Sequence, residues 1–418
     1  MNNNNHPLCV DLDGTLLKSD LLMESFFALL KSNILYLLLI PIWLLKGKAN
    51  LKHQIAQRTE INVSRLPYNH EFVDYLTQQH AEGRTLILAT ASNEKYAHQI
   101  AEHFGFFDKV FASTQQHNLS GHNKCQALIE QYNEQGFVYA GNDTPDLRVW
   151  SHASAAIVVN PLGNVAEKAR KLCAIEAEFI EKRSGLKGYI RALRCHQWMK
   201  NLLIFVALIT SHIAIDALTI THLLLAFFAY SLCASAVYLL NDMLDLEDDR
   251  KHPRKHKRPF AAGTIPLLHG ILLIPLLLDA SLLLAYLIPG PFIWVLLCYF
   301  LLTLAYSLWL KRIMLIDAIT LAGLYTLRVI AGAVAIDVKL SFWLLAFSMF
   351  IFLSLAFVKR TTEIMEALKQ NKEKLSGRDY QTVDLEHLNS MGTTSGYLSV
   401  LVFALYINSS EVVIHYQY

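Results

Sequence analysis

The sequence predicts two structural classes in one chain: an α/β Rossmann-like domain with a helical cap, followed by an all-α polytopic transmembrane helix bundle. Of the 418 residues, 53% are apolar, and the mean hydropathy of +0.30 is high for a soluble protein. Residues 1–188 have a mixed composition, whereas apolar segments of near-spanning length follow one another from about Asn201. We therefore expect one domain over residues 1–180 and a second over residues 181–418.

The net charge and the cysteines exclude several classes of protein. A net charge of +2 gives no reason to expect nucleic-acid binding. The six cysteines are scattered without a C-x-x-C pair, so neither a zinc site nor a disulfide framework is indicated. The N-terminus, Met1–His6, lacks the basic and then apolar pattern of a signal peptide, so the first domain is expected in the cytoplasm.

The first chemical motif follows a short apolar strand that begins near Cys9. Asp11 and Asp13 alternate at the end of this strand, and Gly14 follows in a turn. Two carboxylates with this spacing can divide the labour of phosphate hydrolysis, because one can attack phosphorus while the other moves a proton. The alternative interpretation is an ordinary Asp-rich turn.

Three further elements follow in the order that such a phosphate site requires. Residues 86–90 form a predicted strand ending in the hydroxyl of Thr90, with Ser92 as a competing hydroxyl. Lys124 begins a helical stretch, and a strand over residues 137–141 leads into Asp143 and Asp146. Open α/β sheets bind ligands at the ends of their strands, so these side chains are expected to gather there.

Together these motifs resemble the haloacid dehalogenase phosphatase superfamily over residues 6–180. The resemblance implies that Asp11 is the nucleophile and Asp13 the general acid and base. It also implies that Thr90 and Lys124 bind the phosphoryl group, while Asp143 and Asp146 join Asp11 and Asp13 in a Mg²⁺ site. The family more often has Gly-Asp where this chain has Gly141-Asn142, so Asn142 is a departure at a metal-ligand position.

Residues Phe26–Leu45 are strongly apolar but contain Pro41 and are interrupted by Lys31, Ser32 and Asn33. A spanning helix here would place the rest of the first domain across the membrane from Asp11. We therefore expect a cap region that lies on the lipid bilayer, which suits a substrate with a lipid tail.

The second domain is expected to cross the membrane several times, with its basic loops in the cytoplasm. Basic residues cluster in residues 182–200, 250–258, 311–312 and 359–360, and the intervening loops carry almost none. This alternation predicts a multi-pass protein of the cell inner (plasma) membrane with a cytoplasmic N-terminal domain. The expected spans are 201–215, 219–240, 265–287, 291–310, 313–336, 340–358 and 389–408.

An acidic segment, Asn241–Arg250, follows the second predicted span. Ionisable residues at a membrane boundary are costly, so they are functional candidates by default. On one continuous helix, Asp242, Asp245 and Asp249 would share a face. Three carboxylates on one face suit Mg²⁺ carrying a substrate phosphate, and Arg258 would supply a cation for the anion.

Other polar residues are predicted on the same membrane face as Asp242. Lys359 and Arg360 are interpreted as interfacial anchors whose charged ends reach towards water. The stronger candidates for substrate binding are Arg194, Lys200, Asn241, Tyr306, Lys311, Asp317 and Arg328.

From about Gly188 onward the chain resembles the UbiA-type intramembrane prenyltransferase superfamily. The resemblance rests on the N-D-x-x-D-x-x-x-D motif from Asn241 to Asp249, with Arg258-Pro259 after it. The chain looks most like the polyprenyl-phosphate phosphoribosyltransferase branch, through Arg194-x-x-Gln197-Trp198-x-Lys200-Asn201, Tyr306-Ser307-x-x-Leu310-Lys311, and Asp317 with Arg328. The family fold implies nine transmembrane helices, so roughly two are expected to be missing after the last predicted span.

The substrate prediction depends on the second acidic cluster. Ionising a prenyl diphosphate generally needs two Asp-rich clusters, but here the second is reduced to Asp317 among cations. One cluster with several cations suits phosphoribosyl diphosphate. Asp242, Asp245 and Asp249 would then hold Mg²⁺ on the diphosphate, while Lys200, Lys311 and Arg258 neutralise phosphates.

The predicted reaction is Mg²⁺-dependent transfer of 5-phosphoribose to a polyprenyl phosphate, a step towards a cell-wall arabinan precursor, after which the fused phosphatase removes the 5-phosphate. An aromatic polyprenyltransferase with an associated phosphatase is the alternative. A third interpretation makes the first domain a non-catalytic sensor of phospholigands. The prenyl chain length and the oligomeric state are left open.

Overall fold

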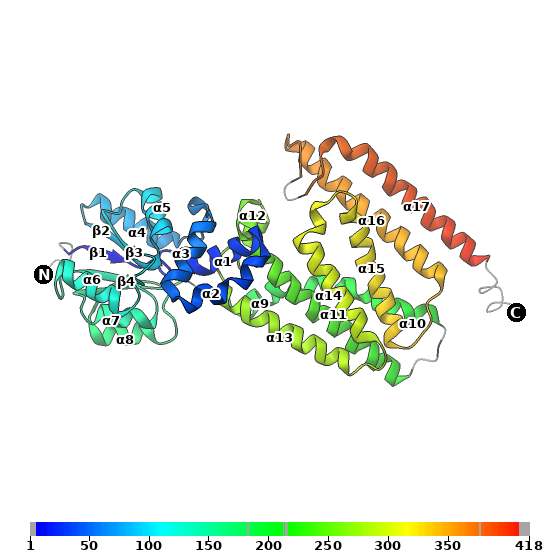
Figure 1. Cartoon of the computed structure of the whole chain (residues 1–418), viewed down its shortest axis with the longest axis horizontal. Helices are drawn as coiled ribbons and strands as arrows, with labels where there is room; N and C mark the ends of the chain where they lie inside the picture. The colour runs from blue at the N-terminus through cyan, green and yellow to red at the C-terminus, as the bar shows by residue number, and fades with distance from the viewer. Residues whose placement is uncertain (1–5, 182–183, 212, 214–215, 376–377, 409–418) are drawn as a thin grey trace. The chain divides into compact units, whose positions relative to one another are not determined.

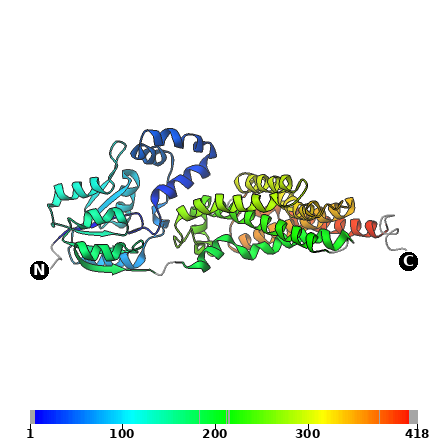
Figure 2. The same cartoon turned by 90° about the horizontal axis from the view of Figure 1, so that it is seen from below.

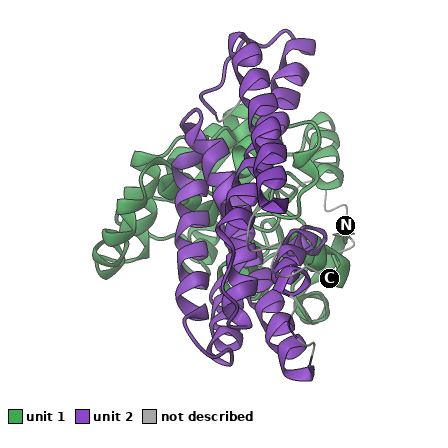
Figure 3. Ribbon diagram, turned by 90° about the vertical axis from the view of Figure 1, so that its right-hand side faces the viewer, with its two compact units in different colours: residues 1–192, 242–272 green, residues 193–241, 273–418 purple. Residues whose placement is uncertain are grey.

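The computed structural model describes residues 6–181, 184–211, 213, 216–375 and 378–408. It forms two compact units, residues 1–192 with 242–272, and residues 193–241 with 273–418 (Figure 3). The division passes through two helices, α11 (Ala217–Leu244) and α13 (Leu267–Tyr286).

The first unit is built on a parallel sheet of six strands in the order β3-β2-β1-β4-β5-β6. In register, Cys9 of the central strand β1 lies between Ile87 of β2 and Tyr139 of β4. This topology confirms the predicted α/β class. The strands are β1 (Leu8–Val10), β2 (Leu86–Asn93), β3 (Lys109–Ser113), β4 (Val138–Gly141), β5 (Ala155–Val159) and β6 (Ala174–Phe179).

Helices cover both faces of this sheet, because successive strand residues point to opposite sides. Leu8 and Val10 pack with α4 (His70–Ala81) and α5 (Glu94–Phe104), which lie above the strands in Figure 1. Cys9 packs on the other side, where the covering helices are α6 (His122–Tyr132), α7 (Leu147–Trp150) and α8 (Val165–Leu172).

The apolar stretch Phe26–Leu45 is divided among three short elements. Helix α1 (Leu21–Ser32) ends at Asn33, and η2 (Ile34–Leu38) and α2 (Ile40–Leu45) follow it, with Pro41 in the first turn of α2. Helix α3 (Lys48–Arg58) completes the cap. Leu38 is 72% exposed and Leu45 is 89% exposed, so η2 and α2 present an uncovered apolar surface within their unit.

The second unit is a helical bundle, and its helices run side by side in both views (Figures 1 and 2). Five helices in the described part of the chain are long and apolar enough to cross a membrane, which supports the predicted multi-pass bundle. These are α11, α13, α15 (Ile316–Ala335), α16 (Phe342–Lys369) and Thr382–Ile407, which comprises η8 (Thr382–Asp384) and α17 (Leu385–Ile407); α14 (Phe292–Leu308) is shorter.

The predicted span at residues 201–215 is not one continuous α-helix in its described part, and residues 212, 214 and 215 lie outside the described residues. The chain instead forms a 3₁₀ stretch, η5 (Cys195–Phe205), and a short helix, α10 (Val206–Ser211). Both pack on α15. At Gly332 of α15 an added Cβ would lie only 1.8 Å from the carbonyl oxygen of Ile204. Tight packing against a neighbouring helix, not the apolar composition alone, therefore decides the conformation of this segment.

Candidate active sites

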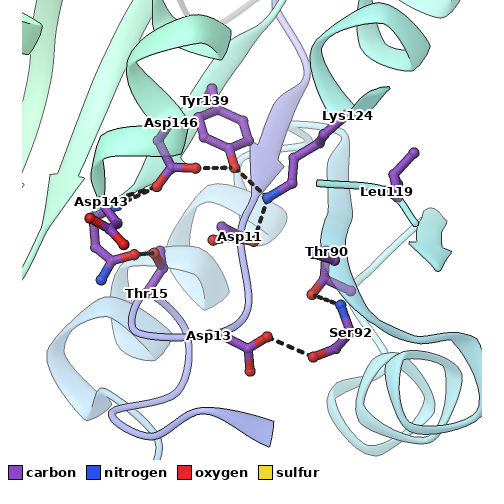
Figure 4. A network of polar contacts seen from close by, with 12 residues as sticks. Asp11, Asp13, Thr15, Thr90, Ser92, Leu119, Lys124, Tyr139, Asp143 and Asp146 are labelled. Atoms are coloured by element: carbon purple, nitrogen blue, oxygen red, sulfur yellow. Dashed lines mark hydrogen bonds and ion pairs between the residues drawn. The ribbon is translucent and has the colours of Figure 1, made fainter. Parts of the chain in front are cut away.

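The carboxyl ends of three neighbouring strands bring the predicted phosphate-site residues together (Figure 4). Asp11 follows β1, Thr90 and Ser92 belong to β2, and Asn142 follows β4. The backbone N–H of Asp11 donates to the carbonyl of Ala140 at 3.0 Å, which fixes the start of the loop against β4. Parallel strands place their carboxyl ends at one edge, as expected for an α/β ligand site.

Lys124 links Asp11 to a buried polar chain. Its Nζ donates to Asp11 Oδ1 at 2.7 Å and to the Tyr139 hydroxyl at 2.8 Å, and that hydroxyl donates to Asp146 Oδ1 at 2.9 Å. Burial raises the pKa of Asp11 to about 6, although the Lys124 charge opposes the rise. The sequence analysis did not select Tyr139, because nothing marks a strand tyrosine as polar before its neighbours are known.

Asp13 is held by two donors. The hydroxyl of Ser92 donates to its Oδ2 at 2.6 Å, and the backbone N–H of Leu21 donates to its Oδ1 at 2.8 Å. Burial, followed by the charge of Asp20, raises the pKa of Asp13 to about 7. A carboxyl group with a pKa near neutrality can both give and take a proton, which suits a general acid and base.

The structure separates the two candidate hydroxyls of β2. Thr90 is fully buried, and its Oγ1 accepts from the backbone N–H of Ser92 at 3.0 Å. Ser92 donates to the Asp13 carboxylate, whereas Thr90 accepts a hydrogen bond from the Ser92 backbone (Figure 4).

The four carboxylates predicted to bind Mg²⁺ do not form one simple set of ligands. Both oxygens of Asp146 accept hydrogen bonds, Oδ1 from Tyr139 and Oδ2 from the backbone N–H groups of Asn142 and Asp143. Asp143 Oδ1 caps the N–H of Thr144 at 2.6 Å. Across the described residues, no group of three His, Cys, Asp or Glu side chains is arranged to hold a metal.

Asn142, the departure from the family pattern, lies beside the Asp11–Gly14 loop. Its Oδ1 accepts from the Thr15 hydroxyl at 3.3 Å. An added Cβ on Gly14, whose φ is +77°, would come within 2.3 Å of Asn142 Nδ2. The oxygens of Asp11 and Asn142 are hard donors of the kind that Mg²⁺ prefers. The donor types therefore suit this ion, with the amide of Asn142 where the family more often has a carboxylate.

The acidic segment does not form the single helix expected from its spacing. Helix α11 ends at Leu244, and Asp245, at φ −102° and ψ 18°, is the N-cap of a new short helix, α12 (Leu246–Lys251). The prediction of one continuous helical face is therefore wrong. Asp245 therefore lies at a helix boundary, where Asp is more common than in the interior of a helix.

Despite this break, Asp242 and Asp249 converge on Arg258. One guanidinium nitrogen, Nη1, lies 3.1 Å from Asp242 Oδ1 and 2.6 Å from Asp249 Oδ2. Both carboxylates are buried. Asp245 Oδ1 lies 3.5 Å from Lys31 Nζ. Asp242, Asp245 and Asp249 offer oxygen donors of the type that Mg²⁺ prefers, but in the described structure they pair with Arg258 and Lys31 and are not gathered into one metal-binding group.

In the second unit, Arg328 of α15 anchors the η5 segment. Its Nε donates to Asn201 Oδ1 at 2.8 Å and its Nη2 to the Tyr299 hydroxyl at 3.0 Å, and all of these groups are buried. Asn201 in turn donates to Ser231 Oγ at 3.0 Å. Arg328 therefore supports the backbone that carries Lys200.

Lys200 is half-buried next to this network. Its Nζ donates to Gln197 Oε1 at 3.2 Å. Burial, with the nearby charges of Lys359 and Arg328, lowers the pKa of Lys200 to about 8. Burial and the neighbouring positive charges disfavour the protonated form of Lys200, so a bound anion such as a phosphate would stabilise that form.

The interpretation of Arg360 as an interfacial anchor is wrong. Arg360 is fully buried and makes a bidentate ion pair with Asp317, which is also fully buried. The hydroxyl of Tyr306 donates to the same carboxylate at 2.8 Å. A charge inside the bundle is stable only when it is paired, and Asp317 provides that pairing. Lys359 is exposed, as expected of an anchor.

Two further predicted residues lie near α11. Lys311, in η7 (Leu310–Arg312), donates to Asn241 Oδ1 at 3.3 Å. The guanidinium of Arg194 lies 5.1 Å from the ring centre of Tyr238. Arg194, Lys200 and Lys311 belong to the second unit, whereas the three aspartates belong to the first. That these basic side chains face the aspartates therefore stays a prediction.

Two family models match separate parts of the chain. Residues 8–148 match the family model "haloacid dehalogenase-like hydrolase", and residues 202–407 match "UbiA prenyltransferase family". The uncharacterized protein y4nM of Sinorhizobium fredii is 37% identical over 98% of this chain and 79% of its own length.

Two further relatives each match about half of this chain. The nodulation protein NoeC of Azorhizobium caulinodans is 32% identical over 54% of this chain and 73% of its own. The decaprenyl-phosphate phosphoribosyltransferase of Mycolicibacterium smegmatis is 33% identical over 54% of this chain and 72% of its own.

Proposed function

Because the chain belongs to the UbiA prenyltransferase family and carries a haloacid dehalogenase-like hydrolase domain, we propose that it is a bifunctional phosphoribosyltransferase and phosphatase. The membrane part transfers 5-phosphoribose from phosphoribosyl diphosphate to a polyprenyl phosphate. The first domain then removes the 5-phosphate from the lipid product. Both reactions take place at the cytoplasmic face of the cell inner membrane.

The Asp317–Arg360 pair is the observation that carries the choice of substrate. Asp317 is a single carboxylate of α15, paired with Arg360 and hydrogen-bonded by Tyr306, where a second Asp-rich cluster would supply several carboxylates. A single acidic segment then has to serve the diphosphate. This supports a sugar diphosphate over a prenyl diphosphate, and the phosphoribosyltransferase relative supports the same choice.

In the proposed transfer, Asp242, Asp245 and Asp249 would hold Mg²⁺, which stabilises the charge that develops on the departing diphosphate. Lys200, Lys311 and Arg258 neutralise phosphate oxygens. An oxygen of the polyprenyl phosphate attacks the anomeric carbon of the ribose, and the bond from that carbon to the diphosphate oxygen breaks. The products are a phosphoribosyl lipid and pyrophosphate.

In the proposed hydrolysis, an Asp11 carboxylate oxygen attacks phosphorus and the ester oxygen leaves with a proton from Asp13. Asp13 then takes a proton from the water that attacks the aspartyl-phosphate, which regenerates Asp11 and releases phosphate. The hydroxyl of Ser92 and the first N–H of α1 orient Asp13 for both transfers. Lys124 offsets negative charge beside Asp11, and Mg²⁺ bound near Asp11 and Asn142 would add to this.

A label-transfer assay with the full chain in lipid nanodiscs tests the transferase. Phosphoribosyl diphosphate labelled in the ribose is expected to label the polyprenyl lipid, and Asp242→Asn is expected to abolish this transfer. The competing function, aromatic prenylation, predicts that label enters only from a prenyl diphosphate. That result would overturn the proposal.

The phosphatase has a separate assay on the same lipid. Phosphate release from purified phosphoribosyl lipid should be lost in Asp11→Asn, while label transfer stays at the level of the unmodified chain. Unchanged phosphate release in Asp11→Asn would exclude Asp11 as the nucleophile. Absence of any metal-dependent turnover in the unmodified chain would favour a phospholigand sensor.

A further inference from the structure

Helix α1 of the phosphatase cap makes a buried ion pair with the acidic segment of the transferase. Arg250 Nη2 lies 2.6 Å from Glu24 Oε1, and Nη1 lies 3.0 Å from Glu24 Oε2. The two side chains are only 9% and 5% exposed. Such a bidentate, desolvated pair fixes geometry strongly, because breaking it would leave a buried charge without a partner.

A second contact joins the same two elements. Lys31, seven residues after Glu24 and therefore on the same side of α1, places its Nζ 2.6 Å from Asp248 Oδ2 and 3.5 Å from Asp245 Oδ1. The cap helix thus contacts the beginning and the end of the segment Asp245–Arg250. Helix α12 has six residues, too few to be stable without such tertiary contacts.

Arg250 also connects α1 to the segment that carries Arg258. Its Nε donates to the carbonyl of Ala261 at 2.9 Å. Arg258, three residues earlier, contacts both Asp242 and Asp249. The Glu24–Arg250 pair therefore links α1 both to α12, which carries Asp249, and to the segment that carries Arg258.

We propose that Glu24 is a positioning residue of the transferase: through Arg250 it fixes helix α12, which carries Asp249, beside the segment that carries Arg258. This inference rests on the proposed function. It makes the cap helix of the phosphatase domain a structural part of the diphosphate site. Groups that hydrogen-bond a metal ligand typically change metal affinity about 10–100-fold when they are removed, and since Glu24 acts one contact further out we expect the lower end of that range.

The test compares Glu24→Gln with Glu60→Gln in the full chain. Glu60 is the matched control, a glutamate of the same domain that pairs with Lys95 at the surface. For Glu24→Gln we expect the Mg²⁺ concentration for half-maximal label transfer, and the KM for phosphoribosyl diphosphate, to rise about tenfold. At saturating Mg²⁺ kcat should largely recover, whereas a loss of folded protein would lower kcat alone.

Two further measurements separate positioning from misfolding. Hydrolysis of p-nitrophenyl phosphate by the same sample should stay within about twofold, since neither Glu24 nor Arg250 contacts Asp11 or Asp13. The exchange Glu24→Arg with Arg250→Glu should restore most of the lost Mg²⁺ affinity. Half-saturation by Mg²⁺ that is the same in Glu24→Gln as in the unmodified chain would overturn the inference.

The inference and the proposed function can fail separately. If the unmodified chain transfers no ribose label, the proposed function fails. Binding of Mn²⁺, read by electron paramagnetic resonance in an Asp11→Asn background, then still tests the positioning role. Weaker Mn²⁺ binding after Glu24→Gln supports it, and equal binding overturns it.

Discussion

At the scale of single residues, the shifted pKa of Asp13 makes the stability of the metal-free domain depend on pH. Its pKa is about 7 in the folded protein, against about 3.9 for an unperturbed aspartate. Between these values the unfolded chain releases this proton while the folded chain keeps it. Folding stability therefore falls as pH rises from about 4 to about 7, and Asp13→Asn removes this loss.

Thermal unfolding in EDTA measures the effect. The unfolding midpoint of Asp13→Asn should rise relative to that of the unmodified chain as pH increases from 4.5 to 8, with about half of the gain reached before pH 6. The remaining slope in the variant belongs partly to Asp11, whose pKa is also raised. A difference between the two midpoints that does not vary with pH would contradict the assignment.

The Asp317–Arg360 pair predicts a second effect at the residue scale. Asp317→Asn removes the buried counter-charge of a fully buried guanidinium and leaves it only Glu363, which is 34% exposed, so the cost should be up to about 3–5 kcal/mol of stability. Replacing both residues, as Asp317→Leu with Arg360→Met, should cost much less, because no charge is then left alone. Thermal stability in detergent checks this order, and equal stability of the single and double variants would count against it.

At the scale of elements, the contact between η5 and α15 should tolerate no side chain at Gly332. A Cβ there would lie 1.8 Å from the Ile204 carbonyl oxygen, so Gly332→Ala must displace the backbone that carries Lys200 and Asn201. We expect a lower unfolding temperature and at least about a tenfold loss of label transfer. Gly323→Ala in the same helix is the control, since a Cβ there meets nothing within 4 Å.

The exposed leucines of η2 and α2 support a cap that lies on the bilayer, as the apolar stretch predicted. Leu38→Asp with Leu45→Asp should raise the KM for the lipid phosphate several-fold and leave p-nitrophenyl phosphate hydrolysis unchanged. Leu172→Asp, at a leucine of α8 that is also exposed, should affect neither substrate. Equal losses on both substrates would point to a damaged fold instead of a lipid contact.

Helices and strands could be predicted from the sequence wherever neighbouring residues alone determine them. Strands β1, β2 and β4, and the helix that begins near Lys124, lie where apolar runs and turn residues indicated them. The break at Asp245 and the 3₁₀ stretch η5 could not be predicted, because both depend on partners distant in the sequence. Composition does not show that the backbone carbonyl of Ile204 packs against Gly332, or that Lys31 and Glu24 of α1 pair with Asp248 and Arg250 of α12.

The same limit applied to the candidate sites. The spacing of Asp11, Asp13 and Lys124 was sufficient to identify the phosphate site, since those residues follow neighbouring strands. The partner of Asp317 was missed because an arginine at the end of an apolar run has the same local pattern whether it faces water or a buried carboxylate. A basic residue within reach of a lone intramembrane acid is the signal that could have suggested Arg360.

At the scale of the whole molecule, the charge pattern of the loops predicts opposite membrane sides for two exposed lysines. Lys339 lies between α15 and α16, and Lys372 lies beyond α16. In a chain without native cysteines, Lys339→Cys should react with a membrane-impermeant maleimide on intact cells, whereas Lys372→Cys should react only after lysis. The reverse pattern would invert the proposed orientation and separate the phosphatase from the cytoplasm.

The bridge that Arg258 makes between Asp242 and Asp249 has a consequence for how the protein is charged with metal. In the proposed Mg²⁺ site, loading would exchange one cation for another, so the apparent affinity for Mg²⁺ would report the difference between the ion and a guanidinium. The released Arg258 is then available to a diphosphate that arrives with the ion. Ion and diphosphate should therefore each tighten the binding of the other, and the site should favour the pair over either one alone.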